Sequence, residues 1–155
     1  MTTLTKGDKA PQFEGTDENG NTIKLSDYAG KRLILYFYPK DLTPGCTTES
    51  CDLRDNYEDL KAKGFEILGV SADTEKMHLK FIEKHSLPFH LLADVDRKTI
   101  QAFGVWGPKK FMGKEYDGIH RTTFVIDGNG VIEAVFGKVV TKAHASQILE
   151  ELENN

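Results

Sequence analysis

The 155-residue sequence is poor in cysteine and has no long hydrophobic run. No stretch approaches the roughly 18 consecutive apolar residues that a membrane-spanning helix needs. The N-terminal segment "MTTLTKGDKAPQF" also lacks the apolar core of a secretory signal peptide. These absences argue against a membrane protein, and we predict a cytoplasmic location.

Neither sign of charge is in strong excess. The sequence has 20 Lys and Arg against 24 Asp and Glu, a formal net charge of −4 and a pI near 5.7. The pair Lys109–Lys110 is too short to form a basic patch, and we expect it in a solvated loop. The charge therefore gives no reason to predict a nucleic acid or an anionic membrane as a partner.

Internal repeats, low-complexity stretches and linkers are also missing, and the composition is ordinary for a globular protein. A chain of 155 residues is long enough to bury one sizeable core without disulfides or metals. We therefore predict one domain over residues 1–155.

Short apolar runs alternate with segments of helical periodicity. The runs "RLILYFYP" and "FEILGVSA" are continuous, which is typical of fully buried strands. The expected elements, in chain order, are a hairpin turning at Asn19–Gly20, strand 32–39, a helix ending near Lys63, strand 65–72, helix 74–85, strand 89–94, helix 96–103 with Asp96 as N-cap, strands 121–127 and 131–137, and helix 141–152. The Gly-rich segment 104–120 is expected to be a surface loop that carries function.

This order predicts an α/β fold in which helices cover both faces of a central mixed sheet. A β-α-β unit followed by a β-hairpin and a terminal helix is the thioredoxin-like arrangement, here with an N-terminal β-hairpin extension. Its first helix begins at the carboxyl edge of the sheet, where open α/β sheets place their sites. Pro39, Thr43 and Cys46 are expected at that edge.

Both cysteines lie in one segment, "YFYPKDLTPGCTTESCDL", residues 36–53. In a reducing compartment such a pair is more often catalytic, redox-sensing or metal-binding than a permanent crosslink. Thr43 is predicted to cap the following helix with Pro44 at its first position, so Cys46 falls in the first turn. There, unpaired N–H groups and the helix dipole favour a thiolate.

The spacing of Cys46 and Cys51 fits neither the C-x-x-C of thioredoxins nor a usual zinc knuckle. On an intact helix their Cα atoms would lie about 8.6 Å apart, whereas a disulfide requires less than about 7 Å. The two thiols are therefore expected to be separate when reduced and to join only after the helix unwinds.

Two alternatives compete with a reactive thiol. A zinc site would need further ligands, but the histidines are scattered singly and each is expected to be a surface or hydrogen-bonded core residue: His78, His85, His90, His120 and His144. His144 in particular is expected on a polar helix face without a role. A buried apolar cysteine is the other alternative, and the polar neighbours Thr43, Thr47 and Thr48 argue against it.

The run Pro39-x-x-x-Thr43-x-x-Cys46 resembles the active-site motif of the peroxiredoxins. The longer "YPKDLTPGCTTESCDLRD", together with Arg121 at the start of a late strand, is similar to the subfamily of bacterioferritin comigratory proteins, or peroxiredoxin Q. The similarity extends from "KGDKAPQF" through "VSADT" and "LLADVD" to "RTTFVID". It covers nearly the whole chain, and no motif position departs from the subfamily pattern.

The resemblance implies a thiol-dependent peroxidase that reduces hydrogen peroxide and organic hydroperoxides. Cys46 would be the peroxidatic thiolate, oxidised to sulfenic acid, and Cys51 would be the resolving thiol that closes an intramolecular disulfide. Thr43 would hold thiolate and peroxide together, Arg121 would stabilise their charges, and Pro39 would shield the pocket.

The resemblance further implies thioredoxin or a similar thiol as reductant, a monomer, and no metal or other cofactor. Glu49, three residues after Cys46, would either steady the arginine or lie in solvent. Two other functions fit thiols in such a fold: a thioredoxin-like disulfide reductase, which would normally show C-x-x-C, and a metal-binding or non-catalytic thiol module. Peroxide consumption without another substrate separates the peroxidase from both, and zinc analysis tests the last.

Overall fold

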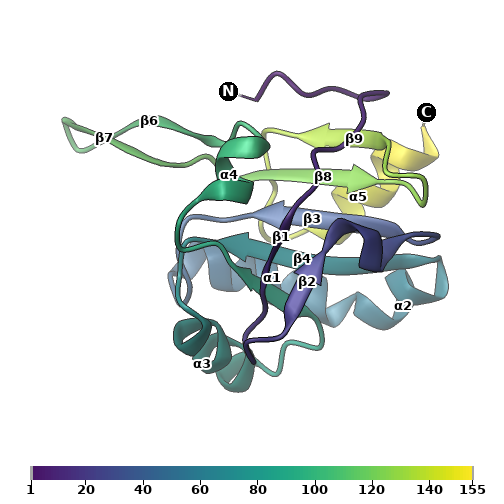
Figure 1. The fold of residues 1–155 in the computed structure, drawn as a ribbon, viewed down its shortest axis with the longest axis horizontal. Helices are drawn as coiled ribbons and strands as arrows, with labels where there is room; N and C mark the ends of the chain where they lie inside the picture. Colours follow the sequence, from purple (N-terminus) through teal and green to yellow (C-terminus); the bar gives the residue numbers. More distant parts are fainter. Residues whose placement is uncertain (1, 155) are drawn as a thin grey trace.

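The computed structural model describes residues 2–154, and its centre is a seven-stranded mixed sheet (Figure 1). The strands are β1 (Glu14–Thr16), β2 (Thr22–Lys24), β3 (Arg32–Phe37), β4 (Phe65–Ser71), β5 (His90–Ala93), β6 (Trp106–Phe111), β7 (Lys114–Ile119), β8 (Thr122–Ile126) and β9 (Ile132–Phe136). The helices are the 3₁₀ helix η1 (Leu25–Tyr28) and the α-helices α1 (Pro44–Asp55), α2 (Tyr57–Ala62), α3 (Glu75–His85), α4 (Lys98–Ala102) and α5 (His144–Glu153).

The order of strands in the sheet is β2-β1-β5-β4-β3-β8-β9. Strands β3, β4 and β5 are parallel, whereas β8 pairs antiparallel with β3 and β9 pairs antiparallel with β8. The hairpin β1–β2 joins the edge of β5. This topology confirms the predicted α/β sheet with an N-terminal hairpin extension, and it places the end of β3 beside the start of β8.

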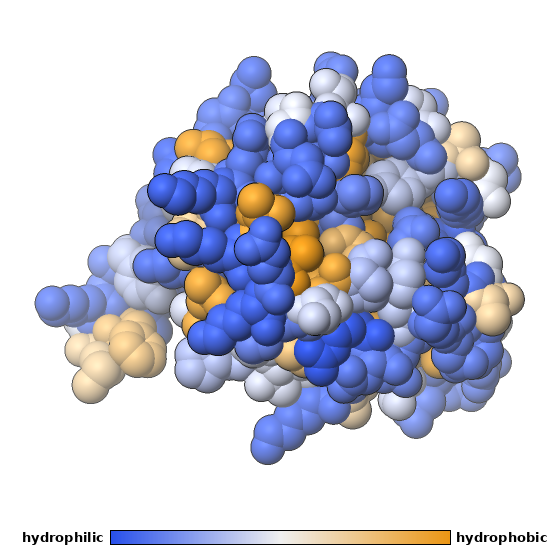
Figure 2. Space-filling model, turned by 90° about the horizontal axis from the view of Figure 1, so that it is seen from below, coloured by the Kyte–Doolittle hydropathy of each residue, from blue (hydrophilic) through white to orange (hydrophobic). Residues whose placement is uncertain are grey.

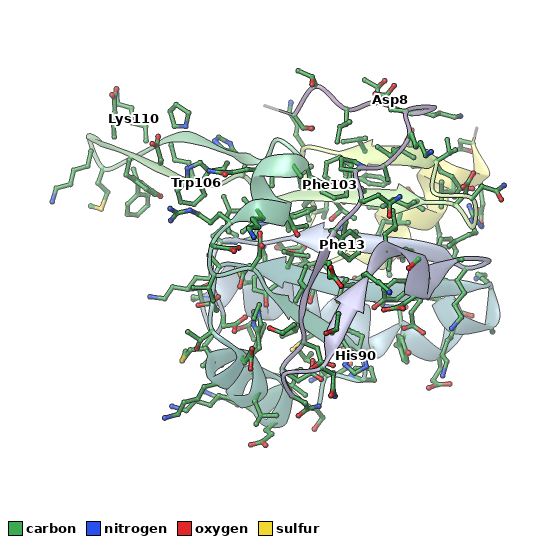
Figure 3. The ribbon with its side chains drawn as sticks, viewed as in Figure 1. Asp8, Phe13, His90, Phe103, Trp106 and Lys110 are labelled. Carbon is green, nitrogen blue, oxygen red and sulfur yellow. The ribbon has the colours of Figure 1, made fainter. Side chains whose placement is uncertain are left out.

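Two hydrophobic clusters cover the two faces of the sheet because successive residues of β3 point to opposite sides. On one face, Ile34 and Tyr36 pack with apolar residues of α1, α2, α3 and α5. On the other, Leu35 and Phe37 pack with α4, η1 and the N-terminal segment. Phe13 and Phe103 lie on this second face, with ring centroids 6.3 Å apart (Figure 3).

The predicted single helix ending near Lys63 is two helices. Between α1 and α2, Asn56 leaves the helical conformation, with φ −107° and ψ 6°. Its side-chain amide donates to the backbone carbonyl of Asp52 at 2.8 Å. Such a side-chain bond competes with the helical ladder. Leu53 and Leu60, on either side of the break, are both buried.

The predicted surface loop over residues 104–120 is wrong, because most of it is the hairpin β6–β7, which projects from the sheet (Figure 1). Its turn, Met112–Gly113, has φ of 52° and 80°. Methionine is rare at positive φ, so the sequence carried no turn signal. Figure 2 shows hydrophobic side chains at the hairpin end, at the left, where Phe111 is 65% exposed and Met112 is 87% exposed.

The predicted N-cap of the fourth helix is also wrong. Arg97, not Asp96, is the residue before α4, and its φ is 63°. The carboxylate of Asp94 accepts from the N–H groups of Thr99 at 3.2 Å and Ile100 at 2.7 Å. Asp94 therefore satisfies two free donors of this helix start, and Asp96 accepts from a third, the N–H of Lys98, at 3.4 Å.

No helix within residues 2–154 is long and apolar enough to cross a membrane.

Candidate active site

Cys46 lies in the first turn of α1, at the carboxyl end of β3, as predicted. Thr43 is the N-cap, with φ −83° and ψ 154°, and Pro44 is the first helical residue. The fixed φ of proline and its missing N–H suit that position. The backbone N–H of Thr47 donates to the carbonyl of Thr43 at 2.9 Å and closes the first turn around Cys46.

Arg121 reaches Cys46 from the residue before β8. Its Nη2 donates to Sγ of Cys46 at 3.3 Å, and its Nη1 donates to Oε1 of Glu49 at 2.6 Å. The pairing of β8 with β3 brings these distant segments together, since Thr122 lies opposite Phe37. Gly45 makes room for the guanidinium, because a Cβ there would lie 3.3 Å from Nη2.

The structure corrects the expectation that polar neighbours keep Cys46 out of the core. Cys46 is only 1% exposed and joins the apolar cluster of Ile34 and Tyr36. Its sulfur is nevertheless not surrounded by apolar atoms alone, because it accepts the hydrogen bond from Arg121. Positive charge therefore faces the sulfur inside an otherwise apolar pocket.

Glu49 does not lie in solvent: it is fully buried and paired with Arg121. Burial raises the pKa of Glu49 to about 7, although the charge and hydrogen bond of Arg121 act in the opposite direction. Burial would lower the pKa of Arg121, but the negative charges at Cys46 and Glu49 outweigh it and raise that pKa above its ordinary value. The site therefore holds one cation between two groups that can each be negative.

The two remaining motif residues, Pro39 and Thr43, lie in the loop between β3 and α1, and both are half-buried. The hydroxyl of Thr43 donates to the carbonyl of Lys40 at 2.8 Å and makes no side-chain cap to the helix. This bond fixes the side chain of Thr43 beside the first turn of α1.

Cys51 is on the same helix as Cys46, is half-buried, and both thiols are free. The neighbours of Cys51 tie this part of α1 to other elements. Ser50 shares a hydrogen bond of 2.9 Å with the hydroxyl of Tyr36, and Asp52 accepts from the N–H of Ala145, at the start of α5, at 2.9 Å.

The prediction that His144 lies on a polar face is wrong, because His144 is fully buried. Its Nε2 is 2.8 Å from the hydroxyl of Thr123 and 3.6 Å from Oε2 of Glu49. Its Nδ1 is 2.9 Å from Oε1 of Gln147. No residue pattern marks this contact, because it depends on how α5 packs against α1.

A second buried network was also missed. Asp41 accepts from the hydroxyl of Tyr38 at 2.5 Å and contacts Nδ1 of His78 at 2.6 Å, and all three side chains are buried. Nε2 of His78 is 2.9 Å from the carbonyl of Leu92. The N–H of Asp41 also donates to Asp73 at 2.8 Å. The network fixes the loop that leads into α1.

The hairpin β6–β7 contributes one further cation. Lys109 is half-buried rather than solvated, and its Nζ donates to the carbonyl of Ile119 at 2.8 Å. Burial lowers the pKa of Lys109, as does the charge of Arg121, whereas negative charge at Cys46 opposes this. Lys110, in contrast, is exposed.

Within residues 2–154, two groups of side chains come close enough to hold a metal ion, Asp17–Glu18–His90 and Asp41–Asp73–His78. Neither group includes a cysteine, and the members of each already contact one another through hydrogen bonds or ion pairs.

Comparisons with known proteins place the chain among the peroxiredoxins. The AhpC/TSA family matches residues 6–135. Peroxiredoxin Bcp of Bacillus subtilis is 50% identical over 152 residues, 98% of this chain and 97% of the relative. Peroxiredoxin Bcp of Escherichia coli is 46% identical over 155 residues, 100% of this chain and 99% of the relative. The chain belongs to the AhpC/TSA family, as a Bcp peroxiredoxin.

Solved structures agree with this family membership. A cysteine-to-serine variant of Xylella fastidiosa PrxQ aligns with a TM-score of 0.92 at 30% identity, over 99% of this chain and 98% of its own. Xanthomonas campestris peroxiredoxin Q aligns with a TM-score of 0.85 at 36% identity, over 92% of this chain and 90% of its own. The predicted family and thioredoxin-like fold are confirmed.

Bcp peroxiredoxins are thiol peroxidases, oxidoreductases that reduce peroxides through a peroxidatic cysteine and are returned to the reduced state by thiols. The chain is therefore a peroxidase of this kind, as predicted.

Proposed function

We propose that Cys46 is the peroxidatic cysteine and that Arg121 is its catalytic cation. The observation that carries the assignment is the hydrogen bond of 3.3 Å from Nη2 of Arg121 to Sγ of Cys46. The other thiol, Cys51, lies near Arg54, but the guanidinium of Arg54 donates to Asp55 and to the carbonyl of His85. A thiolate in the first turn of a helix, facing a guanidinium, is the arrangement that activates sulfur as a nucleophile.

In the first step the thiolate of Cys46 attacks the terminal oxygen of a hydroperoxide, R–O–O–H. The S–O bond forms as the O–O bond breaks, so sulfur is oxidised to sulfenic acid and the peroxide is reduced to RO⁻. A proton from solvent then converts RO⁻ to water or an alcohol. Arg121 stabilises the negative charge as it moves from sulfur to the departing oxygen.

Thr43 and Pro39 complete the pocket in this proposal. The hydroxyl of Thr43 can accept a hydrogen bond from the peroxide while it donates to Lys40, because a hydroxyl is both donor and acceptor. The ring of Pro39, half-buried in the same loop, shields the thiolate from water and carries out no proton transfer.

Cys51 is the resolving thiol. It attacks the sulfenic acid of Cys46, which releases water and leaves a disulfide. Because both residues lie on α1, where an ideal helix separates their Cα atoms by about 8.6 Å, the helix has to open first. Opening would break the bonds of Ser50 to Tyr36 and of Asp52 to Ala145, and it would uncover Leu53.

A dithiol reductant of the thioredoxin type would then reduce the disulfide by thiol exchange and restore both thiols. The uncovered part of α1 would give that reductant a surface present only in the oxidised form. Among relatives, alkyl peroxide reduction is attributed to the bacterioferritin comigratory protein of Xanthomonas campestris, and we extend organic hydroperoxides to this chain. One domain, a monomeric state and a cytoplasmic location stay predictions.

Two single-cysteine variants test the assignment. Cys46→Ser is expected to lose peroxide turnover completely, because serine has no sulfur to oxidise. Cys51→Ser is expected to keep one rapid oxidation and to lose recycling by a thioredoxin system. Stopped-flow oxidation and steady-state peroxide consumption measure the two steps separately, and normal turnover in Cys46→Ser with a lost first step in Cys51→Ser would reverse the roles.

Amide hydrogen exchange tests the opening of α1. Residues 46–53 are expected to lose protection in the disulfide form relative to the dithiol form, while β3 and β4 keep theirs. Equal protection over residues 46–53 in both forms would contradict resolution by local unwinding.

A further inference from the structure

The C-terminal helix α5 places a fully buried histidine behind the arginine of the site. His144 begins α5, and its Nε2 lies 3.6 Å from Oε2 of Glu49, whose Oε1 accepts from Arg121. The chain of contacts is therefore Cys46, Arg121, Glu49 and His144. Each of these except Arg121 is at most 1% exposed.

The hydrogen bonds of Gln147 fix the tautomer of His144. The amide nitrogen of Gln147 donates to the carbonyl of Lys138 at 2.7 Å, and its Oε1 accepts from the N–H of Val140 at 2.9 Å. Oε1 is therefore the atom that faces Nδ1 of His144, at 2.9 Å. Because Oε1 only accepts, Nδ1 must carry the ring proton.

With the proton on Nδ1, the other nitrogen of the neutral ring, Nε2, carries no proton. Nε2 then accepts the hydroxyl of Thr123 at 2.8 Å and has no proton to offer. Burial lowers the pKa of His144 to about 4, against the hydrogen bond of Gln147, which raises it. The ring is therefore neutral at neutral pH and offers Glu49 no hydrogen-bond donor.

The oxygen of Glu49 on this side has no partner. Within residues 2–154, Oε2 of Glu49 is the one buried side-chain oxygen or nitrogen without a hydrogen bond. A buried carboxylate oxygen without a donor is costly, whereas a carboxylic acid can direct its proton at an acceptor. Nε2 of His144 lies 3.6 Å from this oxygen.

We propose that His144 is a positioning residue of the peroxidatic site. Because its Nε2 carries no proton, His144 offers Glu49 no hydrogen-bond donor and keeps Glu49 protonated. The positive charge of Arg121 then stabilises the thiolate of Cys46 alone. The surroundings of Glu49 agree with this role. Asp52 on α1 adds negative charge, which also favours the acid form, and Tyr36 on β3 is a neutral phenol because burial holds its pKa well above the ordinary value.

The consequence for Cys46 is electrostatic. While Glu49 is an acid, Arg121 faces a single anion, the thiolate. Once Glu49 ionises, two anions share the same cation, and the thiolate loses part of its stabilisation. Lys109 is a second cation near the sulfur, but its position on the hairpin does not depend on Glu49.

Two variants that differ by one methylene test the role of the unprotonated Nε2 of His144. The amide of His144→Gln reaches the place of Nε2 and offers N–H donors to Glu49, whereas that of His144→Asn reaches Gln147 but stops short of Glu49. In reduced Cys51→Ser protein, ¹³C NMR of the carboxyl carbon is expected to show Glu49 titrating at about 7. We expect a midpoint lower by about one pH unit in the Gln variant and lower by less in the Asn variant.

A third variant is expected to shift the titration the other way. Thr123→Val removes the hydroxyl that donates to Nε2, so the nitrogen becomes free to accept the proton of Glu49. The midpoint of Glu49 should then rise above that of the parent protein. Identical midpoints in all four proteins, or a fall in Thr123→Val, would overturn the proposal.

The reactivity of Cys46 gives a second readout that does not depend on peroxide chemistry. Near pH 6, His144→Gln is expected to slow iodoacetamide alkylation of Cys46, because more of Glu49 is ionised in that variant and shares Arg121 with the thiolate. Near pH 9 the rates should converge, because Glu49 is ionised in every variant. Equal slowing at both pH values would mean a merely structural role and would overturn the proposal.

The same comparison with hydrogen peroxide separates this inference from the proposed function, on which its catalytic meaning rests. Matching pH profiles for alkylation and peroxide oxidation support both. If alkylation follows the expected profile while the parent protein does not react with peroxide, the positioning role stands and the assignment of Cys46 as the peroxidatic residue fails.

Discussion

The Asp41–His78 pair and the Glu49–His144 pair are both fully buried, but only the first is completely hydrogen-bonded. Asp41 uses one oxygen for His78 at 2.6 Å and the other for Tyr38 at 2.5 Å. Glu49 uses one oxygen for Arg121 and leaves the other without a partner.

The difference suggests two roles. The Asp41–His78 pair is an anchor, which holds the loop before α1 in place, whereas the Glu49–His144 pair can change its protonation. A buried acid–histidine pair in which every polar side-chain atom has a hydrogen bond holds one geometry. A pair with an unsatisfied oxygen can gain or lose a proton at modest cost, and here that proton decides how strongly a cation acts on a neighbouring thiol. One pair fixes where the loop is, and the other sets the charge in the site.

Breaking the anchor should have the largest effect. His78→Leu removes the hydrogen bond between His78 and Asp41 and leaves a buried carboxyl oxygen without a partner. A loss at the upper end for a buried polar group, about 3 kcal/mol or more of unfolding free energy, is expected. Urea unfolding measures the loss, with Lys84→Ala on the exposed side of α3 as control, expected within about 0.5 kcal/mol of the parent. A cost of the control's size for His78→Leu would contradict the role of the pair as an anchor.

Removing the cation comes next. Arg121→Ala should slow oxidation of Cys46 by about 10- to 1000-fold, or about 1.4–4 kcal/mol of barrier, because it removes the guanidinium that donates to the sulfur. Arg32→Ala is the matched control, since Arg32 pairs with Glu133 at 2.9 Å far along the sheet. Stopped-flow kinetics at one pH compares the two variants, and an unchanged rate in Arg121→Ala would mean that the pocket is built otherwise.

Glu49→Gln should remove a pH dependence of stability. The folded pKa of about 7 is above the ordinary value of 4.5, so the stability that Glu49 contributes is present below 4.5 and is lost as pH rises through 7. The loss is of the order of 3 kcal/mol. The Gln variant should show a flatter curve of unfolding free energy between those values, and parallel curves would refute the protonation of Glu49.

A third acid–histidine pair, Glu18–His90, should have the smallest effect, because the His90 side chain is 55% exposed. The hydrogen bond that His90 donates to Glu18 raises the pKa of His90 above 6.5. Burial would raise the pKa of Glu18, but the hydrogen bonds of His90 and Leu91 hold it below 4.5.

The stability from this exposed pair is therefore present between about 4.5 and 6.5, and it falls away on either side. His90→Gln should lower the free energy of unfolding by less than about 1 kcal/mol near pH 5.5, and by a smaller amount near pH 8. Thermal unfolding at the two pH values checks this. A larger loss of stability at pH 8 than at pH 5.5 would contradict the expected pH dependence.

Some of the site was predictable from local sequence alone. Thr43 and Pro44 fix the start of α1, so the position of Cys46 in its first turn follows from capping and proline geometry. Arg121, in contrast, was assigned only from the resemblance to a family. The chain itself gives no reason why a residue 75 positions away should donate to the sulfur.

Other contacts had no local signal at all. His144 lies on a helix with many polar residues, and only the docking of α5 against α1 buries it beside Glu49. The hairpin β6–β7 was missed because its turn places a methionine at positive φ, where glycine or asparagine is expected.

The sequence by itself determined the elements whose cause is local: the buried strands from their continuous apolar runs, the start of α1 from Thr43 and Pro44, and the separation of Cys46 and Cys51 from the helical rise. The tertiary structure alone decided which charges meet. Pairing of β8 with β3 brings Arg121 to the thiol, and packing of α5 on α1 buries Glu49 against His144. The physical reason is that apolar periodicity fixes which side of an element is buried, whereas the protonation of a buried group depends on neighbours that distant segments supply.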